Sequence, residues 1–165
     1  MNSIDIANGI VFQRMNIKKD TFDERIICQK KIYLLEMLGT NMGYSYNWYL
    51  RGPYSPSLAN YVYSNLDILL DTDFRDYKIS EVVENNINLI NGLQEVIPNG
   101  FSTSSWFELL ASLVYIDKNR GSWKIADGKD SLFSELRKYK SQYSIEQCNQ
   151  AYNALEKCGL TYEEK

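Results

Sequence analysis

Apolar side chains recur along this chain at the three- and four-residue spacing that is typical of amphipathic helices. In the clearest segment the apolar positions i, i+3, i+4, i+7 and i+8 are Trp106, Leu109, Leu110, Leu113 and Val114. Because every position of this stripe holds an apolar residue, the pattern predicts a helix that is buried in the core.

A second strong pattern lies between residues 21 and 39. Thr21 and Glu24 have the spacing of a capping box, in which each side chain bonds the other residue's backbone N–H, so a helix is expected to begin at Phe22. Gly39 marks its end after Leu38. The apolar stripe expected for this helix is Phe22, Ile26, Ile32, Leu35 and Leu38.

Start and stop signals place the remaining helices. Ser80 is an N-cap for a helix that should reach Ile97. Ser144 and Gln147 form a second capping box, and Gly159 ends the helix that follows it. The weaker patterns are an opening helix through Ile4, Ile6, Ile10, Val11 and Met15, and a helix that begins at Asp130.

Aromatic and polar residues alternate from Tyr44 to Leu50. This alternation predicts a short strand with one buried face. The residues expected on that face are Tyr44, Tyr46, Trp48 and Leu50. The segment Gly52-Pro53 is expected to turn the chain after the strand.

A helix is expected to follow this turn. Ser55 can cap it, and Pro56, its first residue, has a helical φ and no N–H to leave unpaired. The residues expected to face inward are Leu58, Tyr61, Val62 and Leu66. Residues 67–79 are then expected to form one or two short strands of a hairpin or wing, and Gly121 is expected in a loop.

Together these patterns predict a mainly α fold (α+β with a small sheet). We expect a compact bundle of six or seven helices with a short strand or a winged-helix-like hairpin. A chain of 165 residues can hold one hydrophobic core, so residues 1–165 are expected to form a single domain. The segment 98–101 is expected to be a seam between two helical lobes that share this core.

The composition limits the chemistry of the chain. It contains no histidine, which excludes Ser-His-Asp and Cys-His mechanisms and zinc sites that use histidine. The three cysteines, Cys28, Cys148 and Cys158, form no Cys-x-x-Cys pair, so neither a disulfide framework nor a zinc ribbon is expected. We expect a cytoplasmic protein that has no cleaved leader and no membrane span.

Chemistry that uses carboxylates alone stays open, as in a metal-dependent nuclease or hydrolase. Four aspartates gather in one stretch: Asp67, Asp71, Asp73 and Asp76. Their spacing lacks the glycine and the glutamate of a calcium-binding hand, so an ordinary acidic loop is favoured. We therefore expect no catalytic residue, no metal and no cofactor.

Two motifs resemble a known family. The segment 28–34, Cys-Gln-Lys-Lys-Ile-Tyr-Leu, is similar to a Leu-Gln-Lys-Leu-x-Tyr-Leu helix. The segment 49–58, Tyr-Leu-Arg-Gly-Pro-Tyr-Ser-Pro-Ser-Leu, is similar to an aromatic-x-x-Gly-Pro-x-x-Pro-x-Leu turn. Both motifs are those of the SocA-like antitoxin domain, also called Panacea. Cys28 and Lys31 depart from the pattern, since the family usually has apolar residues there.

A looser likeness links 106–116 and the following Tyr143-Ser144 to the related phage-associated YwgA-like proteins. The resemblance to these two groups implies a compact, mostly helical fold with winged-helix-like parts. Some members are antitoxins that neutralise a toxin or adapt it to proteolysis. The resemblance therefore implies that the chain binds a partner protein, such as a toxin, and is not an enzyme.

The leading prediction is thus a non-enzymatic protein-interaction module, antitoxin-like or a phage-associated adaptor. Tyrosine is enriched at binding hot spots because it combines apolar area with a hydrogen-bonding tip. The residues predicted to bind the partner are Tyr49, Arg51, Tyr54 and Tyr63. Packing of the tyrosines in the core, and a role for Arg51 in fastening its loop, are the structural alternatives.

The alternative function is a winged-helix transcriptional regulator that binds DNA, with helix 22–38 or 56–66 as the reader. The DNA-binding residues of this hypothesis are Lys18, Lys19, Lys30 and Lys31. Acidic residues interleave with these cations, and the formal net charge of the chain is −3. A solvated face of mixed charge is favoured, so DNA is not the favoured partner.

Overall fold

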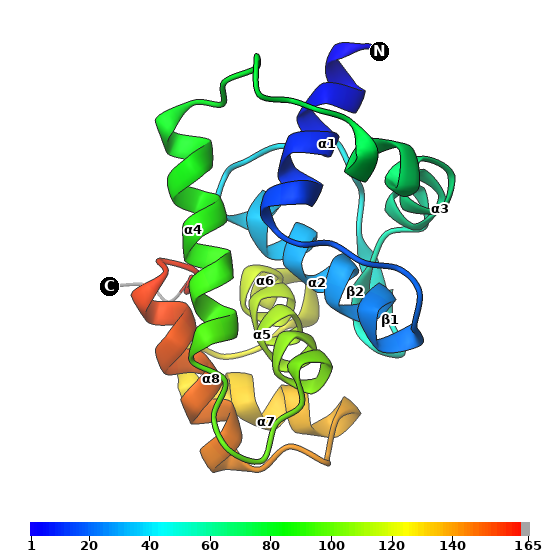
Figure 1. The fold of residues 1–165 in the computed structure, drawn as a ribbon. Coiled ribbons are helices and arrows are strands. Elements are labelled where there is room, and N and C mark those ends of the chain that lie inside the picture. The colour runs from blue at the N-terminus through cyan, green and yellow to red at the C-terminus, as the bar shows by residue number, and fades with distance from the viewer. Residues whose placement is uncertain (163–165) are drawn as a thin grey trace.

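The computed structural model describes residues 1–162, and this range forms eight helices and one two-stranded antiparallel sheet (Figure 1). The helices are α1 (Ser3–Arg14), α2 (Phe22–Met37), α3 (Pro56–Asp71), α4 (Glu81–Glu95), α5 (Thr103–Lys118), α6 (Arg120–Trp123), α7 (Lys129–Tyr139) and α8 (Ile145–Lys157). The strands are β1 (Asn47–Tyr49) and β2 (Gly52–Tyr54). The expected mainly α fold with a small sheet is confirmed. The short α6 contains Gly121, where a loop was predicted.

Helix α5 lies at the centre of the fold. It packs against α2, α7, α8 and β2 (Figure 1). The stripe predicted for it is buried throughout, and its members are Trp106, Leu109, Leu110, Leu113 and Val114. Trp106 also donates its indole N–H to the carbonyl of Leu93 at 2.9 Å, which joins α5 to α4. The prediction of a fully buried helix is confirmed.

The predicted helix starts are confirmed by side-chain hydrogen bonds. The N-cap side chains that accept a backbone N–H of the first turn include Thr21, Ser55, Ser80 and Ser144. Thr21 and Ser144 form complete capping boxes with Glu24 and Gln147. Each bond satisfies one of the N–H groups that a helix start leaves without an intrahelical acceptor.

Residues 67–79 form no strand, so the hairpin or wing predicted there is wrong. Helix α3 instead continues to Asp71, because Leu69 extends its buried stripe. Gln13 donates its side-chain amide to the carbonyls of Leu69 and Thr72, at 2.7 Å each. These two bonds satisfy carbonyl groups at the end of the helix.

The small sheet is a hairpin whose turn is formed by Leu50 and Arg51. The paired residues are Asn47 with Tyr54, Trp48 with Pro53, and Tyr49 with Gly52. The prediction that Gly52-Pro53 turns the chain is therefore wrong, because both residues belong to β2. The predicted alternation of burial is confirmed from residue 44 to residue 48, but the strand is shorter than predicted, because β1 begins at Asn47 and Leu50 is 91% exposed at the turn.

A glycine is needed at position 52 because β2 approaches α5 closely there, and not because the chain turns. Its φ is +95°, and a Cβ at this position would collide with the hydroxyl oxygen of Ser112 on α5. The missing side chain lets β2 lie directly on the central helix.

A single cluster of buried apolar side chains includes residues from α1 to α8. The elements before and after 98–101 therefore share one core. Within residues 1–162, no helix combines the length and the hydropathy that a membrane span requires.

Candidate functional site

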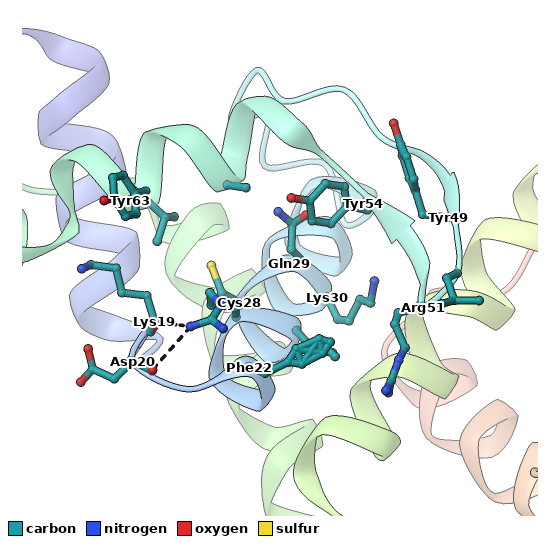
Figure 2. A pocket seen from close by; sticks show the side chains of 15 residues that line it. Lys19, Asp20, Phe22, Cys28, Gln29, Lys30, Tyr49, Arg51, Tyr54 and Tyr63 are labelled. Carbon is teal, nitrogen blue, oxygen red and sulfur yellow. Dashed lines mark hydrogen bonds between the residues drawn. The ribbon is translucent and has the colours of Figure 1, made fainter.

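The hairpin, α2 and α3 enclose a pocket of about 730 Å³. All four residues predicted to bind a partner line it: Tyr49, Arg51, Tyr54 and Tyr63. Figure 2 shows them around the space above α2. We call this space the aromatic pocket; its other lining residues are Lys19, Asp20, Phe22, Arg25, Ile26, Cys28, Gln29, Lys30, Leu50, Ala59 and Val62.

Four aromatic rings form the rim and walls of the aromatic pocket. Tyr49 and Tyr54 meet edge to face, with ring centroids 5.3 Å apart. Tyr63 is 81% exposed at the α3 side of the pocket. Phe22, predicted to belong to the core stripe of α2, is instead half exposed, because it lies in the first turn and faces this pocket.

The chain after β2 is fastened to α2 by the buried side chain of Gln29. Its amide donates to the Ser55 carbonyl at 2.9 Å and accepts the Ser55 N–H at 2.9 Å. The hydroxyl of Ser55 in turn accepts the N–H of Leu58 and caps α3. One glutamine therefore sets the positions of the hairpin and of α3 relative to α2.

Lys30 lies beside Gln29 and forms the second link. Its ammonium donates to the Pro53 carbonyl at 2.6 Å, and the residue is only 1% exposed. Burial lowers the pKa of Lys30 from 10.5 to about 7; Glu108 opposes this shift, whereas the charges of Lys140 and Arg51 add to it. Near neutral pH the amine is therefore divided between its charged and neutral forms.

Glu108 is a buried anion that binds Arg51 at the turn of the hairpin. Its carboxylate accepts hydrogen bonds from Lys140 at 3.1 Å, from Arg51 at 3.3 Å and from the Tyr143 hydroxyl at 3.4 Å. Lys140 also donates to the carbonyl of Leu50 at 3.1 Å. Desolvation is the main cause that lowers the pKa of Lys140 and raises the pKa of Tyr143. This network fixes the turn that presents Arg51.

Arg51 thus has the fastening role that we considered, and it also remains accessible. Its side chain is 56% exposed, and its guanidinium lies 5.3 Å from the centroid of the Phe22 ring. The structure therefore shows the fastening role of Arg51, and its role in binding stays a prediction.

For two of the four lysines predicted to contact DNA, the predicted position on the surface is wrong. Lys30 and Lys31 are buried, and the ammonium of Lys31 donates to the Met15 carbonyl at 3.2 Å and to the Gln94 side chain at 2.6 Å. Lys18 is exposed, whereas Lys19 is partly buried. Half of the proposed cationic face is therefore inside the molecule.

The described residues also bear on metal and thiol chemistry. Residues 1–162 contain no group of three or more acidic or cysteine side chains that could hold a metal ion. Burial raises the pKa of Cys28 to about 12 and that of Cys148 to about 11, and it raises the pKa of Cys158 as well. The reactive thiolate form is therefore scarce at each cysteine near neutral pH.

Sequence reasoning missed three residues that build the site: Gln29, Lys30 as a buried group, and Glu108. The polarity of Glu108 was an available signal, since it interrupts a segment that was predicted to be a buried helix, whereas Gln29 and Lys30 lie outside the apolar stripe predicted for their helix and gave no such signal. A polar residue in such a segment needs a buried partner.

In comparisons with known proteins, no family model, no curated protein and no solved structure matches this chain.

Proposed function

We propose that this chain is a non-enzymatic, cytoplasmic protein-interaction module, antitoxin-like or a phage-associated adaptor. It binds a partner protein through the aromatic pocket. The observation that carries the proposal is the convergence of Tyr49, Arg51, Tyr54 and Tyr63, which come from separate elements, on one cavity.

The resemblance to the SocA-like antitoxin domain supports the same site. Its two motifs, 28–34 and 49–58, are far apart in the sequence, yet both contribute to the lining of the aromatic pocket. They are also joined directly by the hydrogen bonds of Gln29 and Lys30 to the second motif. Because some members of that family neutralise toxins, a toxin is the partner class that the likeness favours.

The composition of the aromatic pocket suits a protein partner. Its tyrosines offer apolar area with few rotatable bonds, and their hydroxyl groups can bond a partner's backbone. Arginine and tyrosine are both enriched among residues that dominate binding energy.

The aromatic pocket is also organised before any partner arrives. Gln29 and Lys30 hold β2 and the start of α3 against α2, while Glu108 and Lys140 hold the turn. A surface that is already ordered loses less conformational entropy on binding, so more of the contact energy appears as affinity.

The test is affinity capture from the native host with the tagged chain. A Tyr49→Ala/Arg51→Ala/Tyr54→Ala variant removes three residues that line the pocket. A Tyr77→Ala/Arg75→Ala variant is the matched control, since both of its residues are exposed and neither lines the pocket. We expect wild type and control to capture a protein that the pocket variant loses. An identical set of captured proteins for all three chains contradicts the proposed site.

A further inference from the structure

The charges around the aromatic pocket do not balance. Lys19, Arg25 and Arg51 line it as cations, together with Lys30, whose amine is partly protonated near neutral pH, and they face one carboxylate, that of Asp20. The whole chain has a net charge of −3, so this local excess of positive charge opposes the charge of the protein as a whole.

Two of these cations have weak or uncharged partners. Lys19 forms an ion pair with Asp67 at 3.4 Å, but the Asp67 side chain is 83% exposed, so water screens this pair. Arg25 donates to the backbone carbonyls of Lys19 and Asp20 and forms no ion pair with a carboxylate of residues 1–162.

Arg51 and Lys30 lie where the aromatic walls meet the turn of the hairpin. Arg51 donates to the carboxylate of Glu108, which Lys140 also binds, and the same carboxylate acts on Lys30 through its charge alone. Among residues 1–162, the buried amine of Lys30 has one hydrogen-bond acceptor, the carbonyl of Pro53. Two cations, Arg51 and Lys140, thus share one buried anion, and the partly protonated amine of Lys30 lies near them.

We infer that the aromatic pocket binds a partner segment in which a carboxylate stands next to a large apolar side chain. The apolar side chain packs between Phe22 and Tyr54, and the carboxylate lies against the exposed guanidinium of Arg51. This inference rests on the proposed function, because it takes the occupant to be a segment of the partner protein.

Charge complementarity selects this occupant. A pocket volume of about 730 Å³ accommodates an aromatic or branched side chain together with its acidic neighbour. A purely apolar segment adds no counter-charge to Arg51 and Lys140, which share the one carboxylate of Glu108, and a basic segment adds further positive charge. A carboxylate bound by the exposed guanidinium of Arg51 gains charge-assisted hydrogen bonds in a partly dry site.

The test uses phage display of random dodecapeptides on the purified chain. The recovered sequences are expected to place Asp or Glu beside Phe, Trp, Tyr or Leu. A synthetic peptide of the commonest sequence and its Glu→Gln or Asp→Asn counterpart are then titrated against wild type, Arg51→Met, Arg51→Lys and Arg75→Met. Thermal unfolding of each variant verifies that it folds.

We expect the amide peptide to bind about tenfold more weakly than the acidic peptide to wild type. Arg51→Met is expected to remove this preference, Arg51→Lys to restore most of it, and Arg75→Met to leave it unchanged. Recovery of no peptide, of peptides without an acidic residue, or of equal affinities for the two peptides overturns the inference.

This test separates the inference from the proposed function. If host capture depends on Tyr49 and Tyr54 while the peptides have no acidic preference, the interaction module stands and the inference about its ligand is wrong. If the acidic preference is found but the pocket variant captures the same host proteins as wild type, the ligand chemistry stands and the proposed function is wrong.

Discussion

Glu108 and Lys140 form a buried ion pair with 3.1 Å between the carboxylate and the ammonium, and their side chains are 3% and 2% exposed. They lie on α5 and just after α7, and the same ammonium bonds the Leu50 carbonyl at the turn of the hairpin. Two residues that are far from the aromatic pocket in the sequence therefore control the position of its arginine.

Glu108→Gln is expected to lower the free energy of unfolding by about 3 kcal/mol, because it leaves the buried charge of Lys140 without a counterion. Denaturant unfolding measures this change. In a double-mutant cycle, Glu108→Gln/Lys140→Met should be more stable than the sum of the single changes implies, since the double variant buries no unpaired charge. Additive effects contradict the coupling.

Gly52→Ala is expected to destabilise the chain by roughly 2–4 kcal/mol, because the new methyl group meets Ser112 and the backbone has a positive φ. Gly100→Ala is the matched control. Gly100 has a nearly equal φ of +93°, but nothing lies within 4 Å of its added Cβ. The free energy of unfolding of the control should fall by only about 1 kcal/mol. An equal fall for both variants contradicts the close approach of β2 to α5.

The stability of the chain should depend on pH through Lys30. Its pKa is about 7 in the folded state and returns to about 10.5 on unfolding, so between these values the unfolded chain binds more protons. Stability therefore rises with pH above about 7, whereas below that value both states are protonated and the cost of burying the charge is fully present.

The comparison with Lys30→Met isolates this contribution, since burial also lowers the pKa of Lys31 and Lys140. Denaturant unfolding of both chains between pH 7 and pH 9 is expected to show wild type gaining about 2 kcal/mol relative to the variant. A constant difference between the two chains across this range contradicts a buried, titrating Lys30.

Duplex DNA from the chain's own promoter is expected not to bind at low salt, because Lys30 and Lys31 are inside the molecule. Fluorescence anisotropy measures this binding. Salt-dependent binding that is lost in a Lys18→Ala/Lys19→Ala variant favours the DNA-binding regulator instead.

The parts of the fold that depend on local chemistry could be predicted from the sequence. The box of Thr21 and Glu24 spans one helical turn, so its pattern is complete within a few residues. The stripe from Trp106 to Val114 likewise needs only the period of one helix. These predictions were confirmed because no distant contact decides them.

The predictions that were wrong depend on distant contacts. Gly52 and Pro53 have the composition of a turn, but pairing with β1 and contact with α5 place them in a strand. Lys30 looks like a surface residue until its acceptor, the Pro53 carbonyl, is brought to it from 23 positions away. The four pocket residues were proposed as part of one partner-binding surface, but only the packing of α2, α3 and the hairpin places them around a cavity.

The central claim is that the aromatic pocket is the surface that binds a partner protein. The most direct measurement is the affinity of the purified captured protein for wild type, Tyr54→Ala and the exposed control Tyr77→Ala, by isothermal titration calorimetry. We predict binding at least about tenfold weaker for Tyr54→Ala and unchanged for Tyr77→Ala. Equal affinities for all three chains contradict the claim.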